Sequence, residues 1–186
     1  MHPLFTVHAG ELLVGDKIES EFPTLRVWIP SKDTGVDLLV TDEDMQRTVS
    51  LQVKMSRDYS HVHSGDRLGR ELVATGWTVI KRDKLASSSA EFWVFVLVPL
   101  EHSVRPRFLV IRPAELLENL TGTFGERTSF HLYPWLLKDG RCVNGRGLKK
   151  AEREAVADGT FQLGPRDLTA CLEDWECLRD LADGHS

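Results

Sequence analysis

Residues 35–55 read GVDLLVTDEDMQRTVSLQVKM and contain two runs that alternate as β-strands do. The first run covers residues 36–41 and the second covers residues 49–56. In the second run the side chains separate by polarity, with Val49, Leu51, Val53 and Met55 on one face and Ser50, Gln52, Lys54 and Ser56 on the other. The acidic segment between the runs, residues 42–47, is too short for a crossover helix. We therefore predict an antiparallel hairpin.

This hairpin should bring three polar side chains together. Gln52 and Lys54 are two residues apart, so both project from the same face of their strand. Asp37 lies early in the neighbouring strand and can reach that face when the two strands pair. The pattern thus predicts that a carboxylate, an amide oxygen and an ammonium group converge at one point.

The surrounding sequence alternates between helical and strand patterns. Residues 9–22 are predicted to form a helix, because Val14, Ile18 and Phe22 recur at helical spacing, and residues 25–29 a short strand. Further helices are predicted over residues 67–75, 113–120, 148–157 and 166–181, and further strands over residues 77–80, 92–98, 108–111 and 130–136. Residues 92–98 are almost wholly apolar, which predicts a strand buried on both faces.

Composition and length indicate one globular domain. The chain has 186 residues, of which 41% are hydrophobic and 27% charged. We expect a core over about residues 9–120 and a C-terminal elaboration over about residues 121–186. The longest apolar stretch, residues 92–100, is too short to cross a bilayer, and the first residues lack a secretion pattern. The expected location is the cytoplasm.

The charge balance limits how the chain could hold a nucleic acid. The formal net charge is −5, so binding by overall positive charge is excluded and local basic patches would be needed. Arg146, Lys149 and Lys150 form such a patch, and Arg57 follows the Lys54 strand. A solvated loop that runs into a helix explains the patch equally well. The three cysteines show no zinc-binding spacing.

The hairpin and its flanks resemble the PD-(D/E)XK nuclease superfamily, which has the restriction-endonuclease-like fold. That family places an acidic residue early in one strand and (Asp/Glu)-x-Lys on the next strand of a hairpin. The matching residues here are Asp37 and Gln52-Val53-Lys54, and a preceding helix places Glu11 where the family often has an inward-pointing glutamate. The Gln-x-Lys variant resembles bacterial Mrr-type restriction endonucleases. The resemblance covers about residues 10–119.

The resemblance implies an α/β fold with a mixed central sheet flanked by helices, here with an extra C-terminal helical segment. It implies hydrolysis of DNA phosphodiester bonds with Mg²⁺, for which Mn²⁺ can substitute. Asp37, Gln52 and Glu11 would hold the metal, and Lys54 would orient or deprotonate the attacking water or stabilise the transition state. We also expect a homodimer, since one site cuts one strand, and neither a membrane partner nor a small-molecule cofactor.

Gln52 is a departure from the family pattern, because it offers a carbonyl oxygen without the negative charge that favours Mg²⁺. One alternative is therefore a catalytically silent domain of the same fold that binds DNA or protein. Another is an unrelated small-molecule enzyme in which the motif is coincidental. This last alternative predicts that Asp37 and Lys54 lie far apart.

Overall fold

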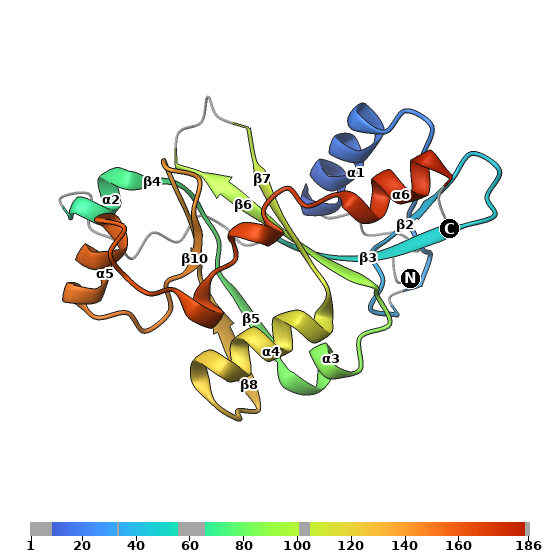
Figure 1. The fold of residues 1–186 in the computed structure, drawn as a ribbon. Helices are drawn as coiled ribbons and strands as arrows, with labels where there is room; N and C mark the ends of the chain where they lie inside the picture. Colours follow the sequence, from blue (N-terminus) through green and yellow to red (C-terminus); the bar gives the residue numbers. More distant parts are fainter. Residues whose placement is uncertain (1–8, 33, 56–65, 101–104, 185–186) are drawn as a thin grey trace.

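The structure is a computed structural model, and it describes residues 9–32, 34–55, 66–100 and 105–184. A mixed eight-stranded sheet crosses the molecule, with helices on both faces (Figure 1). The elements of the first half are α1 (Ala9–Glu21), β1 (Arg26–Trp28), β2 (Leu38–Thr41), β3 (Thr48–Met55), α2 (Arg67–Glu71), β4 (Leu72–Thr75), β5 (Thr78–Lys81), α3 (Arg82–Ala86) and β6 (Phe92–Pro99). Those of the second half are β7 (Arg107–Ile111), α4 (Pro113–Phe124), β8 (Ser129–Leu132), β9 (Pro134–Leu137), β10 (Cys142–Asn144), α5 (Lys150–Ala157) and α6 (Glu176–Asp183).

The predicted hairpin is confirmed. β2 and β3 pair antiparallel, with Leu38 opposite Leu51 and Val40 opposite Val49. β3 then pairs parallel with β6, and this register places Gln52 opposite Trp93. The strand order across the sheet is β1-β2-β3-β6-β4-β9-β10, and β7 also pairs with β6. The hairpin therefore lies towards one edge of the sheet.

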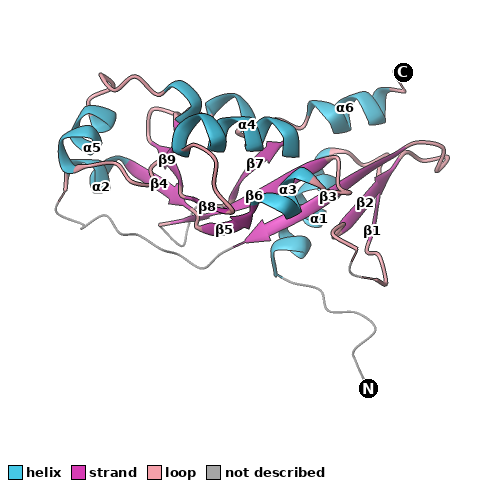
Figure 2. Ribbon diagram, turned by 90° about the horizontal axis from the view of Figure 1, so that it is seen from below, coloured by secondary structure: helices cyan, strands magenta, loops and turns pink. Residues whose placement is uncertain are grey.

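Two apolar cores cover the two faces of the sheet at this end. Val49, Leu51 and Val53 of β3 pack with α1 and α6. The opposite face carries Trp93 and Phe95 of β6, which pack with residues of α3, α4, β5 and β8. The predicted separation of β3 into an apolar and a polar face is thus confirmed for residues 49–54, whereas Met55 is exposed and Ser56 lies outside the described residues. The prediction that residues 92–98 are buried on both faces is confirmed for residues 93–97, whereas Phe92 and Val98 are half-buried. At the far end of the sheet lie α2 and α5 (Figure 2).

The prediction of one helix over residues 67–75 is wrong in its second half. Only Arg67–Glu71 is helical, and Leu72–Thr75 forms β4 between β6 and β9. The prediction of one strand over residues 130–136 is also wrong, because β8 pairs with β5 in a separate two-stranded sheet, while β9 joins the central sheet. Long-range pairing decided both segments, and local patterns do not contain it.

The predicted helix over residues 166–181 is wrong as well, since only its end is α-helical. Leu172 forms a bridge with Leu109 of β7, and Glu173 takes a left-handed conformation with φ 55°. The Glu173 side chain accepts hydrogen bonds from Arg107 Nε, from the Phe108 main chain and from Trp175 Nε1. Contacts with β7 thus outweigh helix continuation here.

The expected C-terminal helical segment needs a related correction. Residues 121–184 contain β8, β9 and β10 in addition to α5 and α6, and β9 and β10 extend the central sheet. α6 packs in the same core as α1 and β3. The segment therefore completes the sheet and one of its cores. Among the described residues, no helix is both long and apolar enough to span a membrane.

Candidate active site

A pocket of about 1190 Å³ lies on the polar face of the hairpin, beside the end of β3. All four residues of the predicted site line it: Glu11, Asp37, Gln52 and Lys54. The opposite wall comes from β5, α3 and the loop that follows α3. Asp37 and Lys54 therefore share one pocket, and this argues against the alternative in which the motif is coincidental.

Asp37 is held against β3 by two hydrogen bonds to one carboxylate oxygen. Gln52 Nε2 donates to Asp37 Oδ2 over 2.5 Å, and the main-chain N–H of Val53 donates to the same oxygen over 2.7 Å. The Asp37 main chain continues the strand pairing, because its N–H donates to Leu51 O over 2.8 Å. The position of the carboxylate is thus fixed by the register of the hairpin.

This network also orients the Gln52 amide. An ionised carboxylate oxygen only accepts hydrogen bonds, so the NH₂ end of the amide must face Asp37. The carbonyl oxygen Oε1 is then directed away from Oδ2. Within the described ranges, no hydrogen bond reaches Asp37 Oδ1 or Gln52 Oε1. Two hard oxygen atoms of the pair therefore remain for a ligand.

Gly35 forms the turn that precedes Asp37. The residue has φ 83°, a conformation that L side chains rarely adopt. A Cβ atom at this position would lie 3.4 Å from Ser89 Oγ and 3.8 Å from Gln52 Oε1. Both distances are ordinary van der Waals contacts, so the turn before Asp37 depends on glycine for its backbone conformation.

The first turn of α1 brings Glu11 to the pocket. Gly10 permits the approach, since a Cβ atom there would lie 2.8 Å from Met55 Cβ at the end of β3. Glu11 is 8% exposed although it is charged. Such burial of a carboxylate carries a desolvation cost and is unusual unless the group has partners. The predicted inward position of Glu11 agrees with this placement.

Lys54 is half-buried on the same face of β3. Its Nζ lies over the Trp93 ring, 5.5 Å from the ring centroid, which is within cation–π range. Lys54 has no ion pair among residues 9–32, 34–55, 66–100 and 105–184. Its ammonium group is therefore not neutralised by a neighbouring carboxylate.

Sequence reasoning missed the opposite wall. Lys81, at the end of β5, and Lys84, in α3, line the pocket and are exposed. Neither is ion-paired in the described part of the chain, whereas many arginines elsewhere on the surface are. Their spacing carries no motif, and only the parallel β3–β6 pairing brings β5 and α3 to this place. No local signal could have identified them.

Three consecutive serines connect the two walls. Ser89 Oγ donates to Thr34 O over 2.9 Å, at the turn that precedes Asp37. Ser88 Oγ accepts a hydrogen bond of 2.9 Å from Trp93 Nε1. Ser87, Ser88 and Ser89 all line the pocket. The loop after α3 therefore contacts both the acidic side and the lysine side of the site.

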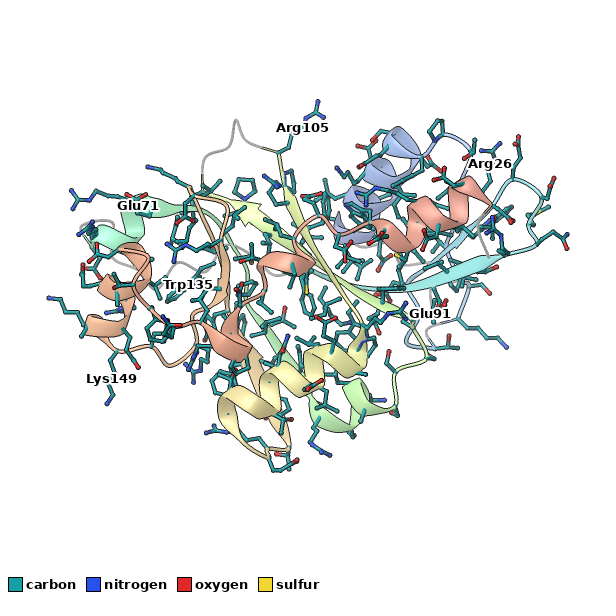
Figure 3. The ribbon with its side chains drawn as sticks, viewed as in Figure 1. Arg26, Glu71, Glu91, Arg105, Trp135 and Lys149 are labelled. Atoms are coloured by element: carbon teal, nitrogen blue, oxygen red, sulfur yellow. The ribbon has the colours of Figure 1, made fainter. Side chains whose placement is uncertain are left out.

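The predicted basic patch does not reach this pocket. Arg146, Lys149 and Lys150 are exposed and follow β10, at the opposite edge of the sheet from the hairpin. Figure 3 shows Lys149 at the α5 end, whereas Glu91, which bonds to Ser50 of β3, lies towards the hairpin end. Arg57 lies outside the described residues. The structure thus separates the patch from the four site residues.

The oxygen atoms of the site suit a hard divalent cation. Asp37 and Glu11 supply carboxylates and Gln52 a carbonyl oxygen, which are ligand types that Mg²⁺ accepts. Three His, Cys, Asp or Glu side chains do not gather anywhere in the described residues. The donor set therefore fits Mg²⁺ in kind, but it carries one negative charge fewer than a set of three acids.

Comparisons with protein-family models, with curated proteins and with solved structures found no match.

Proposed function

We propose that this chain is a metal-dependent nuclease that hydrolyses DNA phosphodiester bonds at the pocket formed by Asp37, Gln52, Lys54 and Glu11. The observation that carries the proposal is the convergence of these four side chains on one pocket from α1, from the turn that precedes β2 and from β3. Lys54 alone, or Asp37 alone, would be an ordinary surface residue. Their common placement, with the hydrogen bond between Asp37 and Gln52, supports a shared chemical task.

The order of the elements supports a restriction-endonuclease-like fold. α1 carries Glu11, and β1 and the β2–β3 hairpin follow it with the acid first and Gln-x-Lys second. A buried strand, β6, then lies beside β3. This order agrees with the resemblance drawn from the sequence, and the mixed sheet with helices on both faces is compatible with it.

The lysines of the pocket support an anionic substrate. Lys54, Lys81 and Lys84 lie around one pocket without ion-pair partners in the described ranges. A phosphodiester strand would supply the missing negative charges and would gain affinity from the release of counterions. Lys81 and Lys84 would bind phosphates next to the scissile one.

Each site residue then has a role. Asp37, Glu11 and the Gln52 carbonyl would hold Mg²⁺, which when bound polarises the phosphoryl group and makes water more acidic. The Gln52 NH₂ group and the Val53 N–H fix Asp37 in place. Lys54 would hold the attacking water or stabilise the charge that develops on the phosphoryl oxygens.

Cleavage assays test the proposal directly. The purified chain is incubated with supercoiled plasmid, single-stranded and branched DNA in Mg²⁺, in Mn²⁺ and in EDTA. We expect metal-dependent cleavage of at least one substrate and a rate loss of about 10²–10³-fold in Lys54→Ala. Lys138→Ala is the matched control, because Lys138 is exposed and does not line the pocket. Cleavage that EDTA leaves unchanged, or that Lys54→Ala retains in full, would refute the proposal.

A second candidate function keeps the fold and the DNA but lacks catalysis. Gln52 motivates it, since only two carboxylates of the described residues line the pocket near the metal position. Calorimetric titration with MgCl₂, with and without a DNA duplex, separates the two functions when it is combined with the cleavage assay. DNA binding without any metal-dependent cleavage would favour the silent binding domain.

A further inference from the structure

The Trp93 ring lies directly below the Lys54 ammonium group. The two residues are on adjacent parallel strands, and Trp93 is the register partner of Gln52. Lys54 Nζ is 5.5 Å from the ring centroid. Trp93 is 4% exposed and lines the pocket, so its ring forms part of the pocket floor.

Ser88 fixes the orientation of this ring. Trp93 Nε1 donates to Ser88 Oγ over 2.9 Å, and the main-chain N–H of Ala90 donates to the same oxygen over 3.2 Å. The Ser88 hydroxyl donates in turn to Ala90 O over 3.2 Å. One donor and two acceptor sites are all that a serine hydroxyl has, and all three are used. The indole is therefore anchored through a hydroxyl that cannot easily turn away.

We propose that Trp93 is a positioning residue for Lys54, and that Ser88 holds Trp93 in the orientation this requires. The inference rests on the proposed nuclease function, and it deepens that function by naming what places its amine. Trp93 itself contacts neither the phosphate nor the metal in this account.

Contact with the Trp93 ring would restrict the otherwise flexible Lys54 side chain. A lysine side chain has four rotatable bonds and carries considerable rotamer entropy. Near Lys54, none of the described carboxylates forms an ion pair that would fix the ammonium group. The negative face of an indole attracts a cation without neutralising it. The ring thus restricts the position of the ammonium group without pairing it with a carboxylate.

The loop that contains Ser88 also contacts the turn that precedes Asp37. Ser89, next to Ser88, donates to Thr34 O at the turn that precedes Asp37. The orientation of the tryptophan and the turn that places the carboxylate thus share one short loop. A shift of the loop would change the distance between the amine and the metal ligands.

Kinetics of four variants test the inference. Trp93→Leu removes the ring, Trp93→Phe keeps a ring but loses the bond to Ser88, and Ser88→Ala keeps the indole but releases it. Trp28→Phe and Thr41→Ala are matched controls, because they remove a similar hydrogen bond: Trp28 Nε1 donates to Thr41 Oγ1 over 3.1 Å. Neither of these residues lines the pocket. Plasmid cleavage in MgCl₂ gives kcat and KM, and circular dichroism checks the fold of each variant.

We expect kcat to fall about tenfold in Trp93→Leu and about threefold in Trp93→Phe and Ser88→Ala, with KM within about twofold. The controls should keep the kinetics of the unmodified chain. A packing defect alone would lower the amount of folded protein and would not give this graded loss of kcat. If Trp93→Leu fails to fold, Trp93→Phe and Ser88→Ala decide. Unchanged kcat in folded variants, or an effect on KM alone, overturns the inference.

A spectroscopic measurement separates this inference from the nuclease function. An aromatic ring shields protons above its face, so the Lys54 Hε resonances of ¹³C-lysine-labelled protein should lie upfield, with Lys54→Arg used for assignment. They should move downfield in Trp93→Leu and part of the way in Ser88→Ala, but not in Trp28→Phe. If the chain cleaves nothing while these shifts occur, the nuclease proposal fails and the placement of Lys54 stands. If cleavage occurs and the Lys54 resonances do not shift in Trp93→Leu, the positioning role of Trp93 is refuted and the nuclease proposal stands.

Discussion

Replacing Gln52 by glutamate should lower the stability of the protein in EDTA and increase the stabilisation that Mg²⁺ provides. Gln52 Nε2 donates to Asp37 Oδ2 over 2.5 Å. Gln52→Glu removes this hydrogen bond to a charged group, which costs about 1.5–3 kcal/mol. It also places two carboxylates together, and two like charges 4 Å apart repel by about 4 kcal/mol at an effective dielectric constant of 20. Rotation or protonation of one carboxyl relieves part of this repulsion.

We therefore expect Gln52→Glu to lose at least about 2 kcal/mol of stability in EDTA, which for a chain of this length lowers Tm by about 4–8 °C. Magnesium should then stabilise the variant more than the unmodified chain. A metal present at its Kd adds about 0.4 kcal/mol, and one present at 100 times its Kd adds about 2.7 kcal/mol. The third negative charge should move the site from the first of these regimes towards the second.

Thermal denaturation by circular dichroism, in EDTA and in MgCl₂, measures both effects. Gln162→Glu is the matched control, because Gln162 is exposed and does not line the pocket, so it adds the same charge elsewhere. The reasoning is refuted if Gln52→Glu is as stable as the control in EDTA. It is equally refuted if MgCl₂ raises the Tm of both variants by the same amount.

Three further predictions concern the turn, the lysine wall and the C-terminal segment. Gly35→Ala should destabilise the protein by about 1–2 kcal/mol because φ is 83°, and should also slow cleavage, whereas Gly125→Ala, with φ 71° in open space, should only destabilise it; melting curves and cleavage rates distinguish the two. Changing both Lys81 and Lys84 to alanine should weaken DNA binding and lower the slope of log K against log salt by about 2, measured by fluorescence anisotropy over a salt series. Burial alone would raise the pKa of Glu173, but hydrogen bonds and a nearby ammonium group outweigh it and lower the pKa from 4.5. Its contribution to stability is thus present above pH 4.5 and lost as pH falls below it, so denaturation over pH 2–7 should show a smaller acid loss in Glu173→Gln.

The hairpin was predictable because its information is local. Alternation with period two fixes which side chains of β3 share a face, and a short linker fixes the antiparallel pairing. Asp37, Gln52 and Lys54 follow from these two facts. Glu11 was placed by resemblance, and the physical reason for its position is the close approach at Gly10.

The rest of the site depends on contacts far apart in the sequence. Lys81, Lys84 and Ser88 reach the pocket only because the chain returns through β4, β5 and α3 before β6 pairs with β3. Trp93 lies in the strand that was predicted to be buried on both faces, and it is buried, but its ring also lies below Lys54. Periodicity measures which residues are buried, and it does not measure what they are buried against.

The failure over residues 166–181 has the same origin. Leu168, Leu172 and Trp175 recur at helical spacing, yet Leu168 and Leu172 pack in one core and Trp175 packs in the other once the chain extends along β7. The hydrogen bonds that Glu173 accepts from Arg107 and from the Phe108 main chain stabilise this extended conformation. A helix would leave the edge of β7 without these partners. Helical periodicity therefore identified the apolar residues that are buried here, but it did not predict the backbone conformation of the segment.

In the proposed nuclease, the charges of the pocket would link metal binding to substrate binding. Asp37 and Glu11 carry two formal negative charges, and Lys54, Lys81 and Lys84 carry three positive ones, so the pocket has no excess negative charge that would attract a dication. Each phosphate of a bound strand brings one negative charge, which favours both the lysines and the metal. In the proposed nuclease, glutamine in place of an acid would then make metal binding conditional on the bound strand. A nuclease built in this way would hold Mg²⁺ firmly only when a phosphodiester is in place. Calorimetry should therefore detect Mg²⁺ binding in the presence of DNA at concentrations where the chain alone shows little or none.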